Sequence, residues 1–270
     1  MPAENMAAQS AAPFLNVEGL TIRFGGLTAV GGLDMAVAKG SIHALIGPNG
    51  AGKSTTFNCI SRFYTPSAGR ITCDGRDITR MPAREMAGLG IARSFQNLEL
   101  FGELSVFENV LIGAHVHAGR SWRDAISARP RGIVEHVDEL LDRTGLTSYA
   151  QTKARNLDFG HQKMVEIARA LAIRPKLLLL DEPAAGLRNR EIAALDRLLC
   201  ELRERDGLTI LLVEHVMQLV MSISDKITVL SFGTKIAEGT AAEVRAHPAV
   251  IEAYLGRDAA HEAAQETHHG

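Results

Sequence analysis

A short glycine-rich segment constrains this chain more than any other part of it. Residues 47–55 read GPNGAGKST and fit the pattern G-x-x-x-x-G-K-[ST]. An apolar run, Ile42–Ile46, comes before the segment, and a plausible helix, Lys53–Ile60, follows it. This strand–loop–helix order is typical of a phosphate-binding loop, in which backbone N–H groups and a helix N-terminus face phosphate oxygens. The segment therefore predicts a nucleotide-binding α/β unit.

The positions of this loop have separate expected roles. Gly50 and Gly52 lack a Cβ atom, so the backbone between them can curl around an anion. Lys53 can reach the β and γ phosphates of a nucleoside triphosphate, and the Ser54 hydroxyl can bind Mg²⁺. The residues expected to surround the phosphates are Gly47, Pro48, Asn49, Gly50, Ala51, Gly52, Lys53, Ser54 and Thr55.

A second motif makes chance a poor explanation for the first. Residues 177–183 read LLLLDEP, and four consecutive leucines predict a strand buried on both faces. Asp181 would bind Mg²⁺ directly or through a water, and Glu182 could orient the attacking water. The alternative is that one of these acids only caps the next loop. His215 follows another apolar strand, Leu208–Val213, and its position alone leaves a packing role and a γ-phosphate contact equally open.

Composition excludes several classes of protein. The chain has 270 residues, 46% of them hydrophobic, and a formal net charge of −2. This charge gives no electrostatic case for non-specific nucleic-acid binding. Three widely spaced cysteines without a C-x-x-C pair favour reduced thiols in a cytosol over a disulfide framework or a zinc site. No apolar run approaches the ~18–20 residues of a membrane helix, and the N-terminus lacks the pattern of a secretory signal.

Hydrophobic periodicity predicts strands alternating with helices. Strands are expected at Leu15–Phe24 (on a sheet edge), Leu33–Ala38, Ile42–Ile46, Arg70–Asp74 (with a D-G hairpin turn), Ile91–Phe95, Leu177–Leu180, Leu208–Val213 and Lys226–Leu230. Helices are expected at Lys53–Ile60, at Gly160–Ile173 and over a stripe from Ile192 to Leu202 that ends at Gly207. This alternation predicts a mainly parallel sheet, with ligands at the carboxyl ends of its strands.

Residues 97–154 differ in pattern and predict a mainly helical insert. Ser105 and Glu108 fit a capping box at the start of one helix. A second helix is expected to end at Gly145. Its apolar stripe is Ile133, Val137, Leu140 and Leu141.

The ordered domain is expected to span residues 14–256. Residues 1–13 are rich in alanine and unpatterned, so they are expected to be disordered. The tail 257–270 has the same character. Its three histidines could bind a metal, but a flexible tail is the favoured interpretation because no further ligands are fixed around them.

Taken together, the motifs resemble the nucleotide-binding subunit of an ATP-binding cassette (ABC) transporter, over roughly residues 14–256. The resemblance implies a P-loop NTPase (RecA-like) core with a mainly parallel sheet, an N-terminal antiparallel β subdomain and a helical insert. GPNGAGKST is similar to the Walker A loop, LLLLDEP to Walker B with its catalytic Glu182, and AAGL at 184–187 to the D-loop. By the same resemblance Phe24 stacks on adenine, Gln96 of the Q-loop senses Mg²⁺ and the membrane partner, and His215 is the switch histidine.

The signature loop of the family departs most from its usual form. LSGGQ is usual and LDFGHQ stands here, so the resemblance implies that Leu157, Asp158, Phe159, Gly160 and His161 contact ATP held by a second subunit. Asp158 occupies the serine position. A carboxylate near a triphosphate would weaken that composite site, but the favoured interpretation is an N-cap for the following helix. Arg188 replaces the usual aspartate of the D-loop, which puts the usual cross-dimer contact in doubt.

Several phrases look like the branched-chain amino-acid importer branch. They are RFGGLTAV, ARSFQNLELF, DEPAAGL, VEHVMQLVMSISD and IEAYLG. The branch implies an ATPase that uses ATP and Mg²⁺ to energise import of branched-chain amino acids or related small polar solutes. The implied partners are a second ABC ATPase subunit, identical or paralogous, transmembrane permease subunits and, indirectly, a solute-binding protein, at the cytoplasmic face of the inner membrane. Two alternatives are a soluble non-transport ABC ATPase and a small-molecule kinase. A soluble ABC ATPase usually carries two cassettes or a long coiled coil. A small-molecule kinase shares the phosphate loop but lacks this set of motifs.

Overall fold

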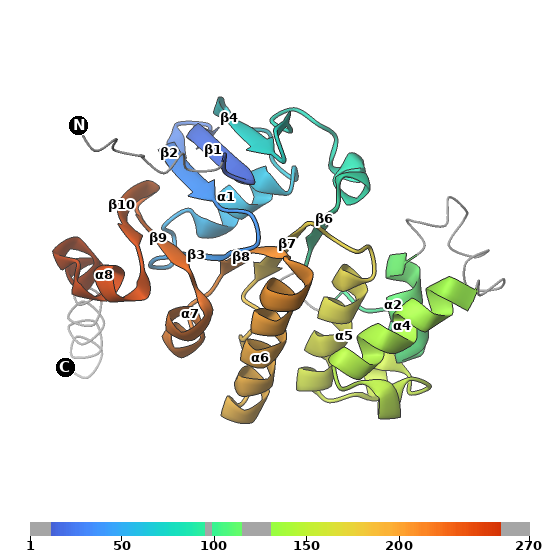
Figure 1. Ribbon diagram of the computed structural model, residues 1–270. Coiled ribbons are helices and arrows are strands. Elements are labelled where there is room, and N and C mark those ends of the chain that lie inside the picture. Colours follow the sequence, from blue (N-terminus) through green and yellow to red (C-terminus); the bar gives the residue numbers. More distant parts are fainter. Residues whose placement is uncertain (1–11, 95–98, 115–130, 255–270) are drawn as a thin grey trace, which may run out of the picture.

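The computed structural model describes residues 12–94, 99–114 and 131–254. The expectations for Gln96, for most of the two chain ends and for part of the helical insert lie outside these residues. Figure 1 shows an antiparallel sheet above a second, mainly parallel sheet, with helices below and a helical lobe on one side. None of the helices in the described ranges is long and apolar enough to cross a membrane.

The antiparallel sheet has the strand order β2-β1-β4-β5. Its strands are β1 (Leu15–Phe24), β2 (Leu27–Val37), β4 (Ala68–Cys73) and β5 (Arg76–Asp77). The expected edge position of β1 is wrong, because β1 pairs with β2 on one side and with β4 on the other. The D-G turn is confirmed: Asp74 and Gly75 both have positive φ, 49° and 74°, as a tight hairpin requires.

The second sheet has the strand order β10-β9-β3-β8-β7-β6. Its strands are β3 (Ile42–Ile46), β6 (Ile91–Arg93), β7 (Leu177–Asp181), β8 (Thr209–Val213), β9 (Lys226–Ser231) and β10 (Thr234–Gly239). All neighbours are parallel except β10, which runs antiparallel to β9 at one edge. The sequence thus predicted the parallel core, whereas β10 is an additional strand.

The helices cover the two faces of the parallel sheet. They are α1 (Lys53–Ile60), α2 (Val106–Ala114), α4 (Arg131–Arg143), α5 (Phe159–Leu171), α6 (Asn189–Asp206), α7 (Met217–Ile223) and α8 (Ala241–Ala246). Short 3₁₀ turns occur at Ala83–Glu85, Ala87–Leu89, Thr147–Tyr149 and Ala154–Asn156. Among the helices of the described residues, α7 and α8 were not expected from the sequence.

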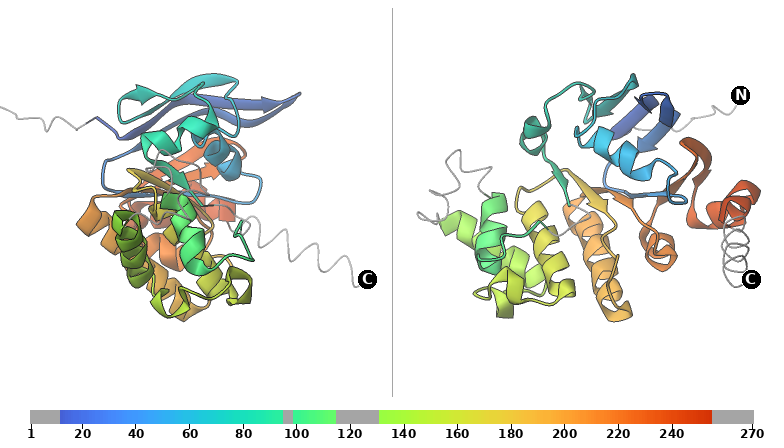
Figure 2. Two further views of the ribbon diagram at one scale, coloured as in Figure 1. Left: turned by 90° about the vertical axis from the view of Figure 1, so that its right-hand side faces the viewer. Right: turned by 180° about the vertical axis from the view of Figure 1, so that it is seen from behind.

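Alternation along the buried strands separates two hydrophobic cores. Leu177 and Leu179 of β7 face the core shared with α1 and the antiparallel sheet. Leu178 and Leu180 face the core shared with α5, α6 and α7. Both faces of the strand are therefore buried, as a run of leucines predicts. The side view in Figure 2 shows the resulting layers.

The helical insert is confirmed where the structure describes it. The Ser105 amide donates to Glu108 Oε2 at 2.9 Å, and the Glu108 amide donates to Ser105 Oγ at 3.2 Å, which is the expected capping box. Val137 of α4 is buried, and Gly145 ends this region with φ of 70°. The insert packs on the core through contacts between α2 and α5.

Strand register places the two predicted motifs at the same side of the parallel sheet, where the carboxyl ends of its strands lie. Leu45 of β3 is opposite Val213 of β8, and Val213 is opposite Asp181 of β7. Because neighbouring strands lie about 4.8 Å apart, the Cα atoms of Leu45 and Asp181 are about 10 Å apart. The phosphate-loop segment leaves β3 at this edge, so it begins two strands away from the acids.

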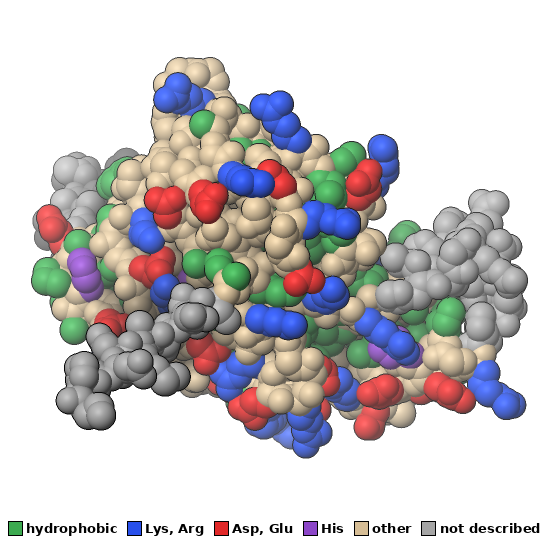
Figure 3. Space-filling model, turned by 45° about the horizontal axis from the view of Figure 1, so that its top comes forward, with side chains coloured by type: hydrophobic (Ala, Val, Ile, Leu, Met, Phe, Trp, Pro, Cys, Tyr) green, Lys and Arg blue, Asp and Glu red, His purple; other side chains and the backbone are tan. Residues whose placement is uncertain are grey.

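The face of the molecule that Figure 3 shows carries charges of both signs. In the view of Figure 3, Lys and Arg side chains lie among Asp and Glu side chains rather than in one cluster. Among the described residues of this face there is accordingly no extended surface of one sign.

Candidate active site

Glycines determine the path of the loop between β3 and α1. Gly47, Gly50 and Gly52 have positive φ values of 149°, 78° and 98°. A Cβ atom on Gly47 would lie 2.1 Å from the Leu230 carbonyl oxygen, and one on Gly52 would lie 2.8 Å from the Ala29 carbonyl oxygen. Side chains at either position would collide with backbone, so the loop depends on glycine for both its conformation and its packing.

Lys53 is folded under this loop. Its ammonium donates to the carbonyl oxygens of Gly47 at 2.7 Å and of Pro48 at 3.0 Å, and the residue is buried. Gly52 is the N-cap of α1 and offers no side-chain acceptor to the first turn. A positive ammonium and the N–H groups of a helix start are thus gathered at one place, which is the arrangement that binds phosphate.

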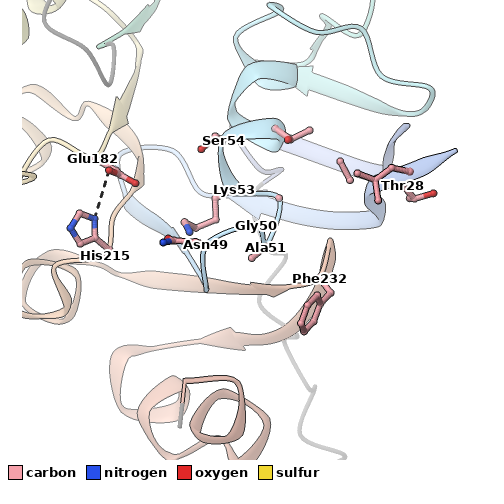
Figure 4. Close-up of a pocket in the computed structure, with 13 residues that line it drawn as sticks. Thr28, Asn49, Gly50, Ala51, Lys53, Ser54, Glu182, His215 and Phe232 are labelled. Atoms are coloured by element: carbon pink, nitrogen blue, oxygen red, sulfur yellow. Dashed lines mark ion pairs between the residues drawn. The ribbon is translucent and has the colours of Figure 1, made fainter. Parts of the chain in front are cut away.

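A cavity of about 770 Å³ opens over the loop. In Figure 4, Glu182 and His215 lie on one side, Thr28 and Phe232 lie on the other, and Lys53 and Ser54 lie between them. The predicted residues that line it are Asn49, Gly50, Ala51, Gly52, Lys53, Ser54, Thr55, Glu182 and His215. Gly47 and Pro48, although predicted, do not line it. Leu27, Thr28, Ala29 and Phe232 line it and were not predicted.

Asp181 and Glu182 are adjacent in sequence but differ in environment. The Asp181 side chain is buried, and Arg93 Nη2 lies 2.8 Å from its Oδ2. Burial raises the pKa of Asp181, and the charge of Arg93 acts in the opposite direction. Glu182 has a positive φ of 49°, a strained conformation for a non-glycine residue, and its carboxylate lies 3.8 Å from His215 Nδ1 at the cavity. The chain turns between the two acids, so only Glu182 faces the cavity.

Glu214 was missed as a site residue and supports this edge of the cavity. Its buried carboxylate accepts from the backbone amides of Ala184 at 2.7 Å, His215 at 2.6 Å and Val216 at 2.8 Å. These bonds fix the segment after Glu182 to the segment that carries His215. A charged residue directly after a buried strand was the available signal, because such a group requires buried partners.

Arg93 was also missed. It is the last residue of β6, beside β7, and it was a charged residue inside an expected strand, Ile91–Phe95. A cation in a strand next to a buried one requires an acceptor, and Asp181 is that acceptor.

The structure leaves the adenine position of Phe24 a prediction. The Phe24 ring packs edge-on against Tyr64, with centroids 5.4 Å apart, and Phe24 is not among the residues that line the cavity. Phe232, at the β9–β10 turn, is 94% exposed and borders the cavity instead.

The signature segment at the start of α5 lies apart from the cavity. The Asp158 carboxylate accepts from the His161 amide at 2.9 Å, so the N-cap interpretation is confirmed. This bond is the main reason why the pKa of Asp158 is lowered. A Cβ on Gly160 would lie 2.5 Å from Glu191 Oε1, and Glu191 also accepts from the amide of Arg188 at 2.7 Å. The signature and D-loop segments therefore pack together within one chain.

The cavity fits a magnesium nucleotide. Its loop requires glycine at positions 47 and 52, where a Cβ atom would collide with backbone, and the Lys53 ammonium donates to a carbonyl oxygen of this loop. Asp181, although predicted as a metal ligand, does not line the cavity, but it is adjacent to Glu182, which does. Its Oδ1 is buried and has no hydrogen-bond partner among the described residues, so this oxygen would suit a cation or a water bound to it. Ser54 lines the cavity at the start of α1. Oxygen ligands of this type suit Mg²⁺.

Comparison with known proteins identifies the family. Residues 30–185, more than half of the chain, match the family model described as ABC transporter. The chain belongs to the ABC transporter family. Residues 234–260 of this cassette also match a model described as branched-chain amino acid ATP-binding cassette transporter.

Curated relatives extend the match over most of the cassette. The chain is 43% identical over 250 residues to BraF, the high-affinity branched-chain amino acid transport ATP-binding protein of Pseudomonas aeruginosa, covering 90% of this chain and 98% of BraF. It is also 43% identical over 250 residues to the protein of that description called LivG in Escherichia coli K12, with the same coverage.

Solved structures agree with the fold. An ATP-binding cassette of an ABC transporter in its ADP conformation superposes with a TM-score of 0.81 at 33% identity, covering 91% of this chain and 100% of that one. A dimeric cassette in a post-hydrolysis state with ADP and Pi gives a TM-score of 0.72 at 25% identity, covering 84% and 98%. The protein is thus an ATPase with the P-loop NTPase fold, and cassettes of its family form dimers.

Proposed function

We propose that this ABC ATPase energises an importer of branched-chain amino acids or related small polar solutes. The observation that carries the proposal is the convergence of Lys53, Glu182 and His215 on one cavity in a chain whose residues 234–260 match the branched-chain amino acid cassette model. The strong similarity to BraF and LivG supports the same solute class.

The roles of the residues follow from their positions. Residues 49–55 hold the phosphates of ATP, with Lys53 leaving the loop carbonyls for phosphate oxygens. Ser54 and Asp181 would hold Mg²⁺, which would neutralise part of the charge of the triphosphate. Glu182 orients the attacking water and accepts its proton, and His215 contacts the γ-phosphate side of the cavity. Gln96 lies outside the described residues, and its role toward Mg²⁺ is proposed from the resemblance of its motif to the Q-loop alone.

The partners follow from the family. Two cassettes close head to tail over two ATP molecules, and the second cassette is identical or paralogous. In the closed pair, Leu157–His161 of each chain contact the ATP of the other. Closure moves permease subunits, which hold this chain at the cytoplasmic face of the inner membrane, and a solute-binding protein delivers the solute to them.

The test begins with the tagged full-length chain expressed in its own organism. We expect a polytopic membrane protein to copurify with it and, after reconstitution into vesicles, labelled leucine to cross the membrane only when ATP is on the cassette side. Competition with unlabelled amides and urea then ranks the solutes. Isolation of the chain without any membrane protein, with ATP hydrolysis intact, would favour the soluble non-transport ATPase instead.

A further inference from the structure

Arg93 makes polar contacts with three side chains on two elements around the proposed Mg²⁺ position. Its guanidinium donates to Asp181 Oδ2 at 2.8 Å, to Asn58 Oδ1 at 2.7 Å and to Ser61 Oγ at 2.5 Å. Asp181 ends β7, whereas Asn58 and Ser61 belong to and follow α1, the helix that begins at the phosphate loop. One side chain therefore joins the two motifs that are expected to share the metal ion.

Two aromatic rings hold the same guanidinium. Its carbon lies 5.0 Å from the ring centroid of Phe57 and 5.1 Å from that of Phe63, within the range of cation–π attraction. The Arg93 side chain is 12% exposed. Contacts on several sides fix its orientation, and the planar fork of arginine is suited to such multiple bonding.

We propose that Arg93 is a positioning residue for the Mg²⁺ site: it holds Asp181 by one carboxylate oxygen and directs the other toward the metal. This inference rests on the proposed role of Asp181 toward Mg²⁺. A carboxylate with 4% side-chain exposure requires a countercharge, which Arg93 provides at Oδ2. Oδ1 is buried and has no hydrogen-bond partner among the described residues, so it is the oxygen left for the cation.

The same contacts imply that Arg93 would stay in place when a cation binds. Displacing it would break the bonds to Asn58 and Ser61 as well as the bond to Asp181. A single ion pair could exchange with Mg²⁺, but a group bonded to three acceptors and packed between two rings has no comparable alternative position. Arg93 thus links α1 to β7.

The test compares ATP affinity in Mg²⁺ with ATP affinity in EDTA, measured on the full-length chain by equilibrium titration. We expect Arg93→Ala to lower the affinity in Mg²⁺ about tenfold and to leave the affinity in EDTA unchanged. Arg93→Lys is expected to lose less, because an ammonium can pair with Asp181 but cannot bridge to Asn58 and Ser61 together. In an Asp181→Asn background, Arg93→Ala should have no further effect.

Controls keep the outcomes separate. Arg70→Ala removes an exposed ion pair with Asp77 and should change neither affinity. If Arg93→Ala does not fold, Arg93→Lys and Ser61→Ala carry the test. Equal losses in Mg²⁺ and EDTA, or no loss, would overturn the positioning role. If Asp181→Asn itself left the Mg²⁺ affinity unchanged, the proposed role of Asp181 would fail, which is a different result from an inert Arg93.

Discussion

The phosphate loop and the signature segment belong to the same ATPase but are built under different constraints. The loop is enclosed by its own chain: Gly47 and Gly52 abut backbone, and Lys53 is 7% exposed. The signature segment is open, with Phe159 46% exposed and the Asp158 side chain 64% exposed. Packing within the chain therefore restricts the residues of the loop, whereas the exposed side chains of the signature segment are restricted mainly by the N-cap that starts α5. The difference in packing agrees with the usual form of GPNGAGKST and with the departure of LDFGHQ from LSGGQ.

The strongest way to sharpen the comparison is to remove the acid that faces the cavity. Glu182→Gln preserves shape but cannot accept a proton, so we expect ATP turnover to fall about 10²–10³-fold while ATP affinity is retained. Steady-state hydrolysis and nucleotide titration would measure the two quantities. Near-normal turnover would remove Glu182 from the chemistry.

The strand that enters the loop provides a test at low pH. His43 of β3 is buried beside Thr228, 2.8 Å from its Oγ1, and burial lowers the pKa of His43 to about 4. In the unfolded chain the His43 side chain becomes protonated near pH 6.5, whereas in the folded chain it becomes protonated only near pH 4. Stability is therefore complete above pH 6.5 and declines between pH 6.5 and 4, by about 3 kcal/mol in total.

Chemical unfolding of the wild type and of His43→Gln at a series of pH values would isolate this contribution. The variant cannot titrate at position 43, so its loss of stability over the same window should be smaller. Parallel curves for the two proteins would show that His43 is not the group responsible. The exposed Asp158 of the signature segment should give little such dependence, because solvent screens its interactions.

Adding a methyl group to the phosphate loop is expected to lower ATP affinity, with a free-energy cost somewhat smaller than that of the His43 titration. Gly52→Ala forces a φ of 98° on alanine and places its Cβ 2.8 Å from the Ala29 carbonyl oxygen. Strain of about 1–3 kcal/mol corresponds to a loss of roughly 5- to 150-fold in ATP affinity if the loop relaxes out of its binding conformation. Gly132→Ala, at a helical position with open space, is the matched control and should bind ATP normally.

The smallest effect is expected in the signature segment. Asp158→Ser keeps an N-cap acceptor, so unfolding free energy should change by less than about 0.5 kcal/mol, whereas Asp158→Ala should lose about 1 kcal/mol. ATPase activity of the assembled transporter should be unchanged by Asp158→Ser. A clear increase in rate would instead support a composite site weakened by the carboxylate.

Local signals made much of this fold predictable. The observed bounds of β3 and α1 coincide with those expected, because an apolar run, a glycine turn and a helix are all coded by neighbouring residues. α8 also had a local signal, since Thr240 and Glu243 form a capping box, but at six residues it was overlooked. β10 contains few apolar residues and depends on pairing with β9. The central place of β1 likewise depends on two partners distant in sequence.

The residues of the candidate site also fall into two groups, those that a local motif predicts and those that depend on distant partners. The place of Lys53 and Glu182 at the cavity was predictable from the spacing of their motifs. Arg93 and Glu214 were not, because their importance comes from buried partners that the fold brings to them: Asp181 in one case and three backbone amides in the other. Isolated charges beside apolar strands are the one sequence sign of such supports.

The turn between β9 and β10 stabilises the phosphate loop through backbone hydrogen bonds. The Gly233 amide donates to the Ala51 carbonyl at 3.0 Å, and its own carbonyl accepts from the Gly31 amide at 2.9 Å. Anyone shortening this protein for biosensor or directed-evolution work should therefore keep the chain beyond residue 233. A version trimmed at the end of β9 would retain every residue of the Walker motifs and still lose the brace that holds them.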